Sequence, residues 1–307
     1  MSYYLGIDGG GTKTKVAIMD EKEQIIYEGS SGPSSIDTVS SNDTLKSFSN
    51  ALEPFFDNNP KATFRSVFCG LGGIVDEKDF NHVENLLKNL KGVHPSTHLR
   101  ARNDMENALY SGLCFDEGIS LICGTGMVAY GKDMFENTHK AGGWGFKEGD
   151  FGSGYDLGMR ALRHVIKAFD GRLDKDDFSK EIAEQIELHK ANDFVKIMND
   201  RYLDRTWIAN LSPIVTKHAN LGNIYAKNIV DLATDELVLA VKAVYNNLRL
   251  KEKVLVIVGS LGNSTGYFVN QLHKKIHEID ATIKIIKPIV DPAVAAAKMA
   301  KYLLQAS

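Results

Sequence analysis

An acid, three glycines, a hydroxyl and a lysine near the start of the chain have the composition of a phosphate-binding turn. In order, these residues are Asp8, Gly9, Gly10, Gly11, Thr12 and Lys13. Consecutive glycines carry no Cβ, so the backbone N–H groups of a tight bend can face a bound anion. The acid, at the end of an apolar run, is placed to hold a metal ion through water. The loop contains neither a Walker ending nor a G-x-G-x-x-G pattern, and by itself it leaves open a glycine-rich β-turn without a ligand.

Two further glycine turns follow apolar runs that read as strands. The run 119–123 leads into Gly124, Thr125 and Gly126, and the run 253–258 leads into Gly259, Ser260 and Leu261. Between the first two turns, a strand near 97–102 ends in an asparagine and an acid, Asn103 and Asp104. Three such turns in this order, with two acids at strand ends, favour parts of one nucleotide site over three unrelated bends.

Composition limits the class of protein. A chain of 307 residues with 43% hydrophobic residues is long enough for two domains with real cores. The net charge of −3 gives no electrostatic reason to expect binding to nucleic acid or to a membrane surface. Cys69, Cys114 and Cys123 form no CxxC pair and lie in or beside apolar runs, which indicates free thiols in a reducing compartment. No signal peptide and no span of about 18 apolar residues is visible, so we expect a soluble, cytoplasmic protein.

Periodicity gives a coarse order of elements. The chain opens with three antiparallel strands near 4–8, 15–20 and 24–29, and a helix capped by Ser41, Asn42 or Asp43 follows. Further elements are expected as strands near 66–71, 119–123, 127–131, 253–258 and 281–286 and helices near 80–90, 105–113, 266–278 and 292–304, with mostly helix from 155 to 250. The strand–glycine turn–strand unit at 119–131 repeats the opening pattern, which predicts two similarly built halves. Residues 139–155 hold six glycines and read as a functional loop or a loose connection.

Taken together, these motifs resemble the sugar kinase/Hsp70/actin superfamily and, within it, the N-acetylglucosamine kinase and BadF-type ATPase family. The matching segments are 7–14 (IDGGGTKT), 103–104 (ND), 124–126 (GTG), 142–145 (GGWG), 149–153 (GDFGS) and 258–260 (VGS). The resemblance implies an α/β fold of two ribonuclease H-like (actin-like ATPase) domains with mixed five-stranded sheets and ATP in an interdomain cleft. It places the N-terminal domain at 1–117 with a returning helix at 291–307. It places the C-terminal domain, which would carry nucleotide-binding residues and a helical insertion, at 118–290.

The resemblance also implies a reaction. ATP would donate its γ-phosphate to the 6-hydroxyl of N-acetylglucosamine or N-acetylmuramic acid, with Mg²⁺ placed by Asp8. The loops 9–13 and 124–126 would hold the β- and γ-phosphates, and Gly259, Ser260 and Leu261 would lie against the adenosine. Asp104 would take the proton of the attacking hydroxyl. The residues themselves leave a second possibility for Asp104, namely the N-cap of the helix 105–113.

The expected sugar contacts come from several segments of the chain. They are Ser35, Gly72, Asp104, Gly143, Trp144 and Asp150. An aromatic ring suits the apolar face of a pyranose and a carboxylate accepts hydroxyl groups, although Trp144 could instead fill the core. The family usually has asparagines where this chain has Ser34-Ser35-Ile36 and Met127-Val128. These replacements predict room for a sugar substituted at O3.

Three other functions of the family and superfamily remain to be weighed. A BadF-type activator of a dehydratase holds an iron–sulfur cluster through cysteines, and no exposed pair is visible here. A glucosamine kinase uses the same motifs. A sugar-responsive repressor carries an N-terminal helix-turn-helix, which this sequence lacks. His139, His164 and His218 show no metal-ligand spacing. By resemblance, we expect a homodimer that binds only ATP and a small amino sugar.

Overall fold

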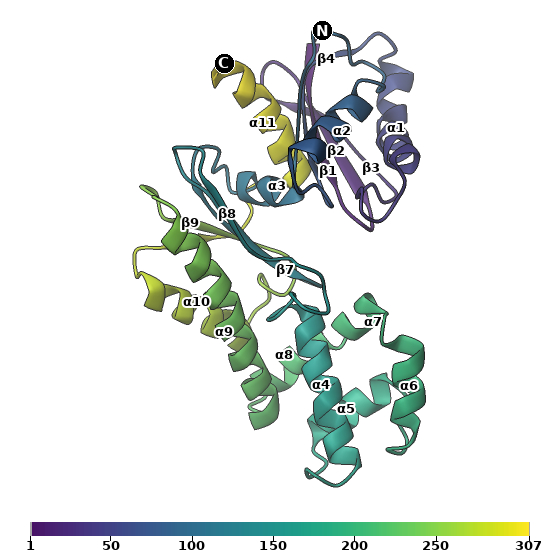
Figure 1. Cartoon of the computed structure of the whole chain (residues 1–307), viewed down its shortest axis with the longest axis vertical. Coiled ribbons are helices and arrows are strands. Elements are labelled where there is room, and N and C mark those ends of the chain that lie inside the picture. Colours follow the sequence, from purple (N-terminus) through teal and green to yellow (C-terminus); the bar gives the residue numbers. More distant parts are fainter. Residues whose placement is uncertain (1, 307) are drawn as a thin grey trace. The chain divides into compact units, whose positions relative to one another are not determined.

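The computed structural model describes residues 2–306. Its contacts divide the chain into unit 1, Met1–Phe115 with Pro288–Ser307, and unit 2, Asp116–Lys287 (Figure 1). The domain bounds expected from the sequence begin at residue 1 and end at residue 307, and these two residues lie outside the described part. No helix within residues 2–306 is long and apolar enough to cross a bilayer.

Unit 1 is built around one mixed sheet. Its elements are β1 (Ser2–Gly9), β2 (Thr14–Met19), β3 (Ile25–Ser31), α1 (Ser41–Asn58), β4 (Thr63–Leu71), α2 (Glu77–Leu87), β5 (His98–Arg102), α3 (Asp104–Tyr110) and α11 (Pro292–Ala306). The strand order is β3-β2-β1-β4-β5, with the first three strands antiparallel and β1, β4 and β5 parallel. The carboxyl ends of β1, β4 and β5 therefore lie at one edge of the sheet.

Helices cover both faces of this sheet. Leu5 and Ile7 of β1 belong to a core cluster with Phe48 and Leu52 of α1. The alternate residue, Gly6, points to the opposite face, where the backbone of α11 lies against it. The last helix thus returns to the first sheet and packs on β1, β2 and β4.

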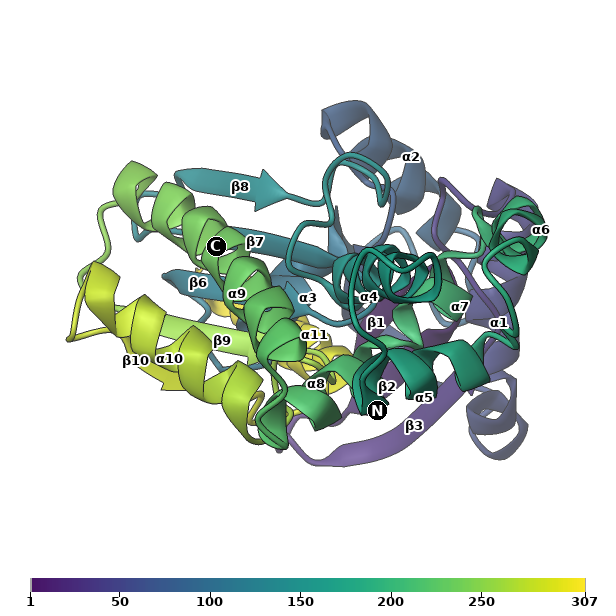
Figure 2. The ribbon, with the colours of Figure 1, turned by 90° about the horizontal axis from the view of Figure 1, so that it is seen from below.

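Unit 2 repeats this plan and adds helices. Its elements are β6 (Gly118–Cys123), β7 (Met127–Lys132), β8 (Thr138–Gly142), α4 (Gly154–Phe169), α5 (Asp177–Gln185), α6 (Asp193–Arg201), α7 (Arg205–Ala209), α8 (Ser212–Asn220), α9 (Ile224–Asn247), β9 (Val254–Val258), α10 (Tyr267–Ile279) and β10 (Lys284–Ile286). The strand order is β10-β9-β6-β7-β8, with β9 parallel to β6 and to β10. Figure 2 shows α9 and α10 side by side over this sheet. The prediction of two similarly built α/β halves with mixed five-stranded sheets is confirmed.

Some local predictions were wrong. The first helix is capped by Ser40, whose hydroxyl accepts the Asp43 N–H, and not by residues 41–43. The segment 139–155 is not irregular throughout, because its first residues pair with β7 as the edge strand β8. The strand expected near 281–286 covers only Lys284–Ile286, since the Ile283 N–H turns back to the Asp280 carbonyl oxygen.

Candidate active site

The first glycine turn joins β1 to β2 at the carboxyl edge of the unit 1 sheet. The Gly10 N–H donates to the Lys13 carbonyl oxygen over 3.0 Å and closes the turn. The Gly10 carbonyl oxygen accepts the N–H groups of Ser34 and Ser35 over 3.0 and 3.2 Å. The loop after β3 therefore holds the glycine turn in place through backbone hydrogen bonds.

The three glycines of this turn serve different purposes. A Cβ at Gly9 would lie 2.3 Å from the Ser34 hydroxyl oxygen, so packing requires a glycine there. A Cβ at Gly10 would meet nothing closer than 3.9 Å, and one at Gly11 nothing closer than 3.5 Å. Neither backbone lies in the left-handed region. The space directly against Gly10 and Gly11 is thus open, which leaves the backbone of this turn accessible to a ligand.

Asp8, the acid before the turn, is oriented by a buried asparagine. The Asn107 amide donates to Asp8 Oδ1 over 2.8 Å and to the Ile7 carbonyl oxygen over 3.1 Å. Burial raises the pKa of Asp8 to about 6, and the Asn107 hydrogen bond works in the opposite direction. A carboxylate with one oxygen held in this way can direct the other toward a hydrated cation.

Sequence reasoning missed Asn107. It lies on α3 three residues after Asp104 and is completely buried. A Cβ at Gly70 would overlap its side chain, so β4 leaves room for it. The sequence carries no clear signal for this residue, because its burial and its partners Asp8 and Ile7, about 100 residues away, are visible only in the structure.

An ion pair between distant parts of the chain lies close to Asp8. Lys15 on β2 pairs with Asp291, which precedes α11 and also accepts the Ala293 N–H over 3.1 Å. The hydrogen bond to Asp291 raises the pKa of Lys15. Asp291 in turn contributes to the raised pKa of Asp8. The start of the last helix is thereby fixed beside the glycine turn.

Asp104 is the first residue of α3 and does not cap that helix. The cap is Asn103, whose side-chain oxygen accepts the Met105 N–H over 3.0 Å and whose amide donates to the Ile74 carbonyl oxygen. The capping alternative for Asp104 is therefore wrong. Burial, then the negative charges of Asp8 and Asp37, raise the pKa of Asp104 to about 7. A carboxyl group that exchanges its proton near neutral pH is suited to general-base catalysis.

Two of the expected sugar contacts are adjacent in unit 1. Ser35 is buried and its hydroxyl donates to Asp37 over 2.5 Å. A Cβ at Gly72 would lie 2.6 Å from the same hydroxyl oxygen. The Gly72 N–H donates to the Gly9 carbonyl oxygen over 2.8 Å, which ties both residues to the glycine turn.

The structure brings the two glycine turns of unit 2 together. The parallel strands β6 and β9 end side by side, and the Gly262 N–H donates to the Cys123 carbonyl oxygen over 3.0 Å. Gly259 has φ +106°, and a Cβ there would lie 2.4 Å from the same oxygen. Ser260 is exposed. Leu261 packs in the hydrophobic core instead.

The side chain of Asp150 holds the turn 124–126 in place. One of its carboxylate oxygens accepts the Met127 N–H over 3.2 Å, and the other pairs with Arg205 of α7 over 2.5 Å. Only 4% of Asp150 is exposed. A Cβ at Gly126 would overlap the Arg205 guanidinium, which explains the second glycine of this turn. Sequence reasoning named Asp150 but not Arg205.

Trp144 lies at the surface, so the alternative that it fills the core is wrong. Its exposed fraction is 66%. The Lys140 ammonium lies 4.1 Å from the ring centroid and donates to the Gly143 carbonyl oxygen over 3.1 Å. Gly143 has φ +66°, a conformation that favours glycine before the exposed ring.

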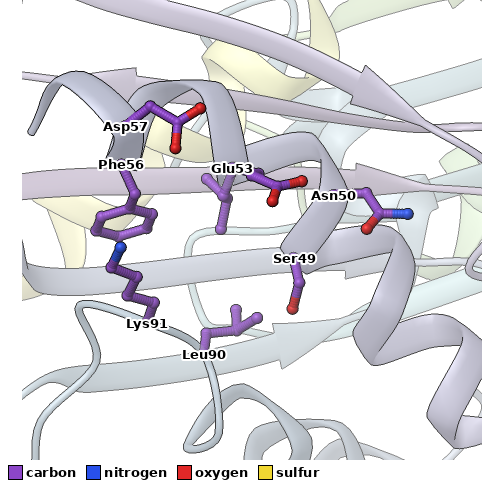
Figure 3. A pocket seen from close by; sticks show the side chains of 8 residues that line it. Ser49, Asn50, Glu53, Phe56, Asp57, Leu90 and Lys91 are labelled. Carbon is purple, nitrogen blue, oxygen red and sulfur yellow. The ribbon is translucent and has the colours of Figure 1, made fainter. Parts of the chain in front are cut away.

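A hollow in unit 1 lies away from these residues. It has a volume of about 270 Å³ and is lined by Ser49, Asn50, Leu52, Glu53, Phe56 and Asp57 of α1 with Leu90 and Lys91 (Figure 3). The neighbouring Gly92 carbonyl oxygen accepts the N–H of Phe64, near the start of β4. This hollow therefore lies toward the end of the sheet opposite the glycine turn, and none of the expected site residues lines it.

No group of three or more metal-ligating side chains occurs within the described residues. His164 and His218 are buried on helices, where both rings pack against Phe178. Cys69 and Cys123 are also buried, and burial raises the pKa of both thiols, that of Cys123 to about 12.

Comparison with known proteins places these features in context. A model of the BadF/BadG/BcrA/BcrD ATPase family matches residues 5–300. An N-acetylmuramic acid/N-acetylglucosamine kinase of Clostridium acetobutylicum is 30% identical over 98% of this chain and 99% of the relative. An N-acetyl-D-glucosamine kinase of Dictyostelium discoideum is 31% identical over 97% of each chain.

A solved structure supports the same fold. A candidate N-acetylglucosamine kinase from Chromobacterium violaceum superimposes with a TM-score of 0.77 over 98% of this chain and 99% of the other. The two sequences are 20% identical, so this likeness concerns the fold alone.

Proposed function

Since this chain belongs to the BadF/BadG/BcrA/BcrD ATPase family, we propose that it is an ATP-dependent amino-sugar kinase. It transfers the γ-phosphate of ATP to the 6-hydroxyl of N-acetylglucosamine or N-acetylmuramic acid, the sugars named for the relative from Clostridium acetobutylicum. The observation that carries the proposal is Asp104. Its carboxyl group has a pKa of about 7. Asp104 is also the first residue of α3, the helix that carries Asn107, whose amide donates to Asp8.

Phosphoryl transfer requires positioning and neutralisation of charge more than covalent chemistry. We assign the phosphates of ATP to the glycine turns, because Gly10 and Gly11 leave open space and their loop is held from behind by the loop after β3. Thr12 and Lys13 are exposed on that turn and supply a hydroxyl and a positive charge. The turn 124–126 and Gly259 with Ser260 supply further backbone to the nucleotide. Leu261 does not contact the nucleotide; its side chain packs in the core and anchors the loop that carries Gly259 and Ser260.

The Asp8 carboxylate is chemically suited to bind Mg²⁺, which prefers oxygen ligands. It has a free carboxylate oxygen at a strand end next to the open phosphate side of the turn. When bound, Mg²⁺ neutralises negative charge on the phosphates. Asn107 fixes the Asp8 carboxylate, so the cation does not have to order it.

Asp104 accepts the proton of the sugar 6-hydroxyl as the new O–P bond forms. Ser35, Gly72, Gly143 and Trp144 are proposed as sugar contacts, with the exposed tryptophan ring against the pyranose. Asp150 already has both oxygens engaged. We therefore expect it to act on the sugar chiefly by holding the Met127 backbone, with any sugar hydroxyl sharing the same oxygens.

The activator of a dehydratase is the less favoured function. Cluster ligation requires accessible thiolates. Burial keeps Cys69 and Cys123 protonated inside their strands. A glucosamine kinase is distinguished from the proposed enzyme only by substrate. We further propose that the protein works in the cytoplasm as a homodimer.

A substrate panel tests the proposed function. Purified protein is given ATP, Mg²⁺ and either N-acetylglucosamine, N-acetylmuramic acid or glucosamine, and release of ADP is followed by a coupled assay. We expect turnover with the two N-acetylated sugars and at least tenfold lower kcat/KM with glucosamine. 6-Deoxy-N-acetylglucosamine is the matched control and should give no ADP above background. Absence of sugar-dependent ADP release with all three sugars would refute the kinase.

The pH dependence of kcat/KM tests the base. Because Asp104 has a raised pKa of about 7, it is protonated and inactive at lower pH and ionised above that value. We expect kcat/KM for N-acetylglucosamine to rise about tenfold per pH unit below pH 7 and to level off above it. An apparent pKa near the ordinary aspartate value of about 4 would show that the base is not in this environment.

A further inference from the structure

A small cavity opens where the loop 143–153 meets α4. It has a volume of about 80 Å³. Four aromatic side chains contribute to its walls, namely Phe146, Phe151, Tyr155 and Tyr202. The rings of Phe146 and Tyr155 meet edge to face at 5.2 Å, which gives one wall a fixed shape. The cavity is therefore small, with aromatic rings in its walls.

The charges around this cavity do not cancel. Its acids are already paired, because Asp150 is bound by Arg205 and Asp156 by Arg160 over 2.9 Å. The other two charged residues of the lining are Lys147 and Arg163. Across residues 2–306, no carboxylate lies within ion-pair distance of either of these two cations. Two positive charges are thus available beside apolar walls.

The cavity and the turn 124–126 share residues. Asp150 lines the cavity and accepts the Met127 N–H directly after the turn. Tyr155 also lines it and donates its N–H to the Thr125 carbonyl oxygen over 3.1 Å. A sugar held against the residues after this turn would therefore have the cavity next to it.

We propose, on the basis of the kinase function above, that this cavity is a subsite for a short carboxylate-bearing substituent of the amino sugar. Arg163 and Lys147 bind the carboxylate, and the aromatic walls enclose it. A cavity of about 150 Å³ holds the six carbons of a benzene ring, so by proportion the cavity of about 80 Å³ has room for about three non-hydrogen atoms. The carboxylate of the lactyl group on O3 of N-acetylmuramic acid has this size and charge, and the other two carbons of that group would lie at the mouth of the cavity. A guanidinium binds such a carboxylate through two parallel hydrogen bonds.

The test compares Arg163→Gln with Lys167→Gln. Both side chains are exposed on α4, but Lys167 does not line the cavity. Loss of a charged hydrogen-bond partner should lower kcat/KM for N-acetylmuramic acid about tenfold or more. The value for N-acetylglucosamine, which lacks the carboxylate, should stay within about twofold. Lys167→Gln should change neither, and adding Lys147→Gln to Arg163→Gln should increase the loss.

Binding of each sugar is measured separately by calorimetry, so that the result does not depend on turnover. Weaker binding of N-acetylmuramic acid to Arg163→Gln, with unchanged binding of N-acetylglucosamine, would support the subsite even if neither sugar were phosphorylated. The subsite is wrong if Arg163→Gln, like Lys167→Gln, changes the dissociation constants of the two sugars by the same factor. It is also wrong if the wild-type protein binds N-acetylglucosamine but not N-acetylmuramic acid. Binding of neither sugar would overturn both the subsite and the proposed function. Turnover of N-acetylglucosamine alone would overturn only the subsite.

Discussion

Replacing Asp104 by asparagine should lower kcat for N-acetylglucosamine by about 10²- to 10⁴-fold, the range usual for loss of a general base. Asparagine has nearly the same shape, but its amide cannot take a proton at neutral pH. The cap of α3 is Asn103 and not Asp104, so the helix keeps its first turn. We therefore expect the dissociation constants of ATP and sugar to change by less than about threefold, because the loss falls on the chemical step.

The measurement pairs the coupled assay with calorimetry of both ligands. Glu77→Gln is the matched control, because Glu77 is an exposed acid in the first turn of α2 in the same unit. That variant should keep the kcat of the wild-type protein. If Asp104→Asn retained more than about a tenth of the wild-type kcat, Asp104 would not be the base.

The same substitution has a second consequence, for stability. The unfolded chain releases the Asp104 proton near pH 4, whereas burial and the charges of Asp8 and Asp37 raise the pKa of Asp104 in the folded state to about 7. Between these values the folded state binds the extra proton, so the free energy of unfolding falls as pH rises and stays lower above pH 7. Asparagine removes this penalty. Asp104→Asn should therefore be more stable than the wild-type protein at pH 8, by on the order of 1–3 kcal/mol, and equal to it near pH 4.

The sequence predicts the local parts of this site well. A strand, a glycine turn and a strand follow from a pattern within about twenty residues, and the turns at Gly10 and Gly124 are in fact hairpins between antiparallel strands. Asp104 was placed at a strand end by the same kind of pattern. The resemblance to a family added roles to these residues, and the structure adds the raised pKa of Asp104.

Long-range pairs could not be predicted in this way. Lys15 and Asp291 are 276 residues apart, and Arg205 meets Asp150 across 55 residues. Nothing in the local composition of either partner indicates the other. Trp144 shows the opposite difficulty, because an aromatic residue among glycines is compatible with a core position or an exposed one, and only the structure shows the exposed ring.

The second large effect concerns how the last helix is held on the first sheet. A Cβ at Gly6 would lie 2.1 Å from the Ala297 backbone nitrogen and 2.2 Å from the Ala293 carbonyl oxygen. Gly6→Ala must therefore push α11 away from β1. Overpacking of a core usually costs about 1–3 kcal/mol, and a collision with backbone should reach or exceed the upper end. At about 2–4 °C per kcal/mol, we expect the Tm to fall by about 10 °C or more.

Gly10→Ala is the matched control, since the new Cβ would meet no atom within 3.8 Å and the Tm should change little. It should instead weaken ATP binding, because the methyl group occupies the space assigned to phosphate. The atoms that collide with residue 6 belong to the backbone, so shortening the side chain opposite cannot relieve them. The double variant Gly6→Ala/Ala297→Gly should therefore melt no higher than Gly6→Ala alone in a calorimetric scan. A Tm for Gly6→Ala within about 2 °C of the wild-type value would mean that α11 moves aside at little cost. In that case the pairing of Asp291 with Lys15 would not depend on close packing of this helix against β1.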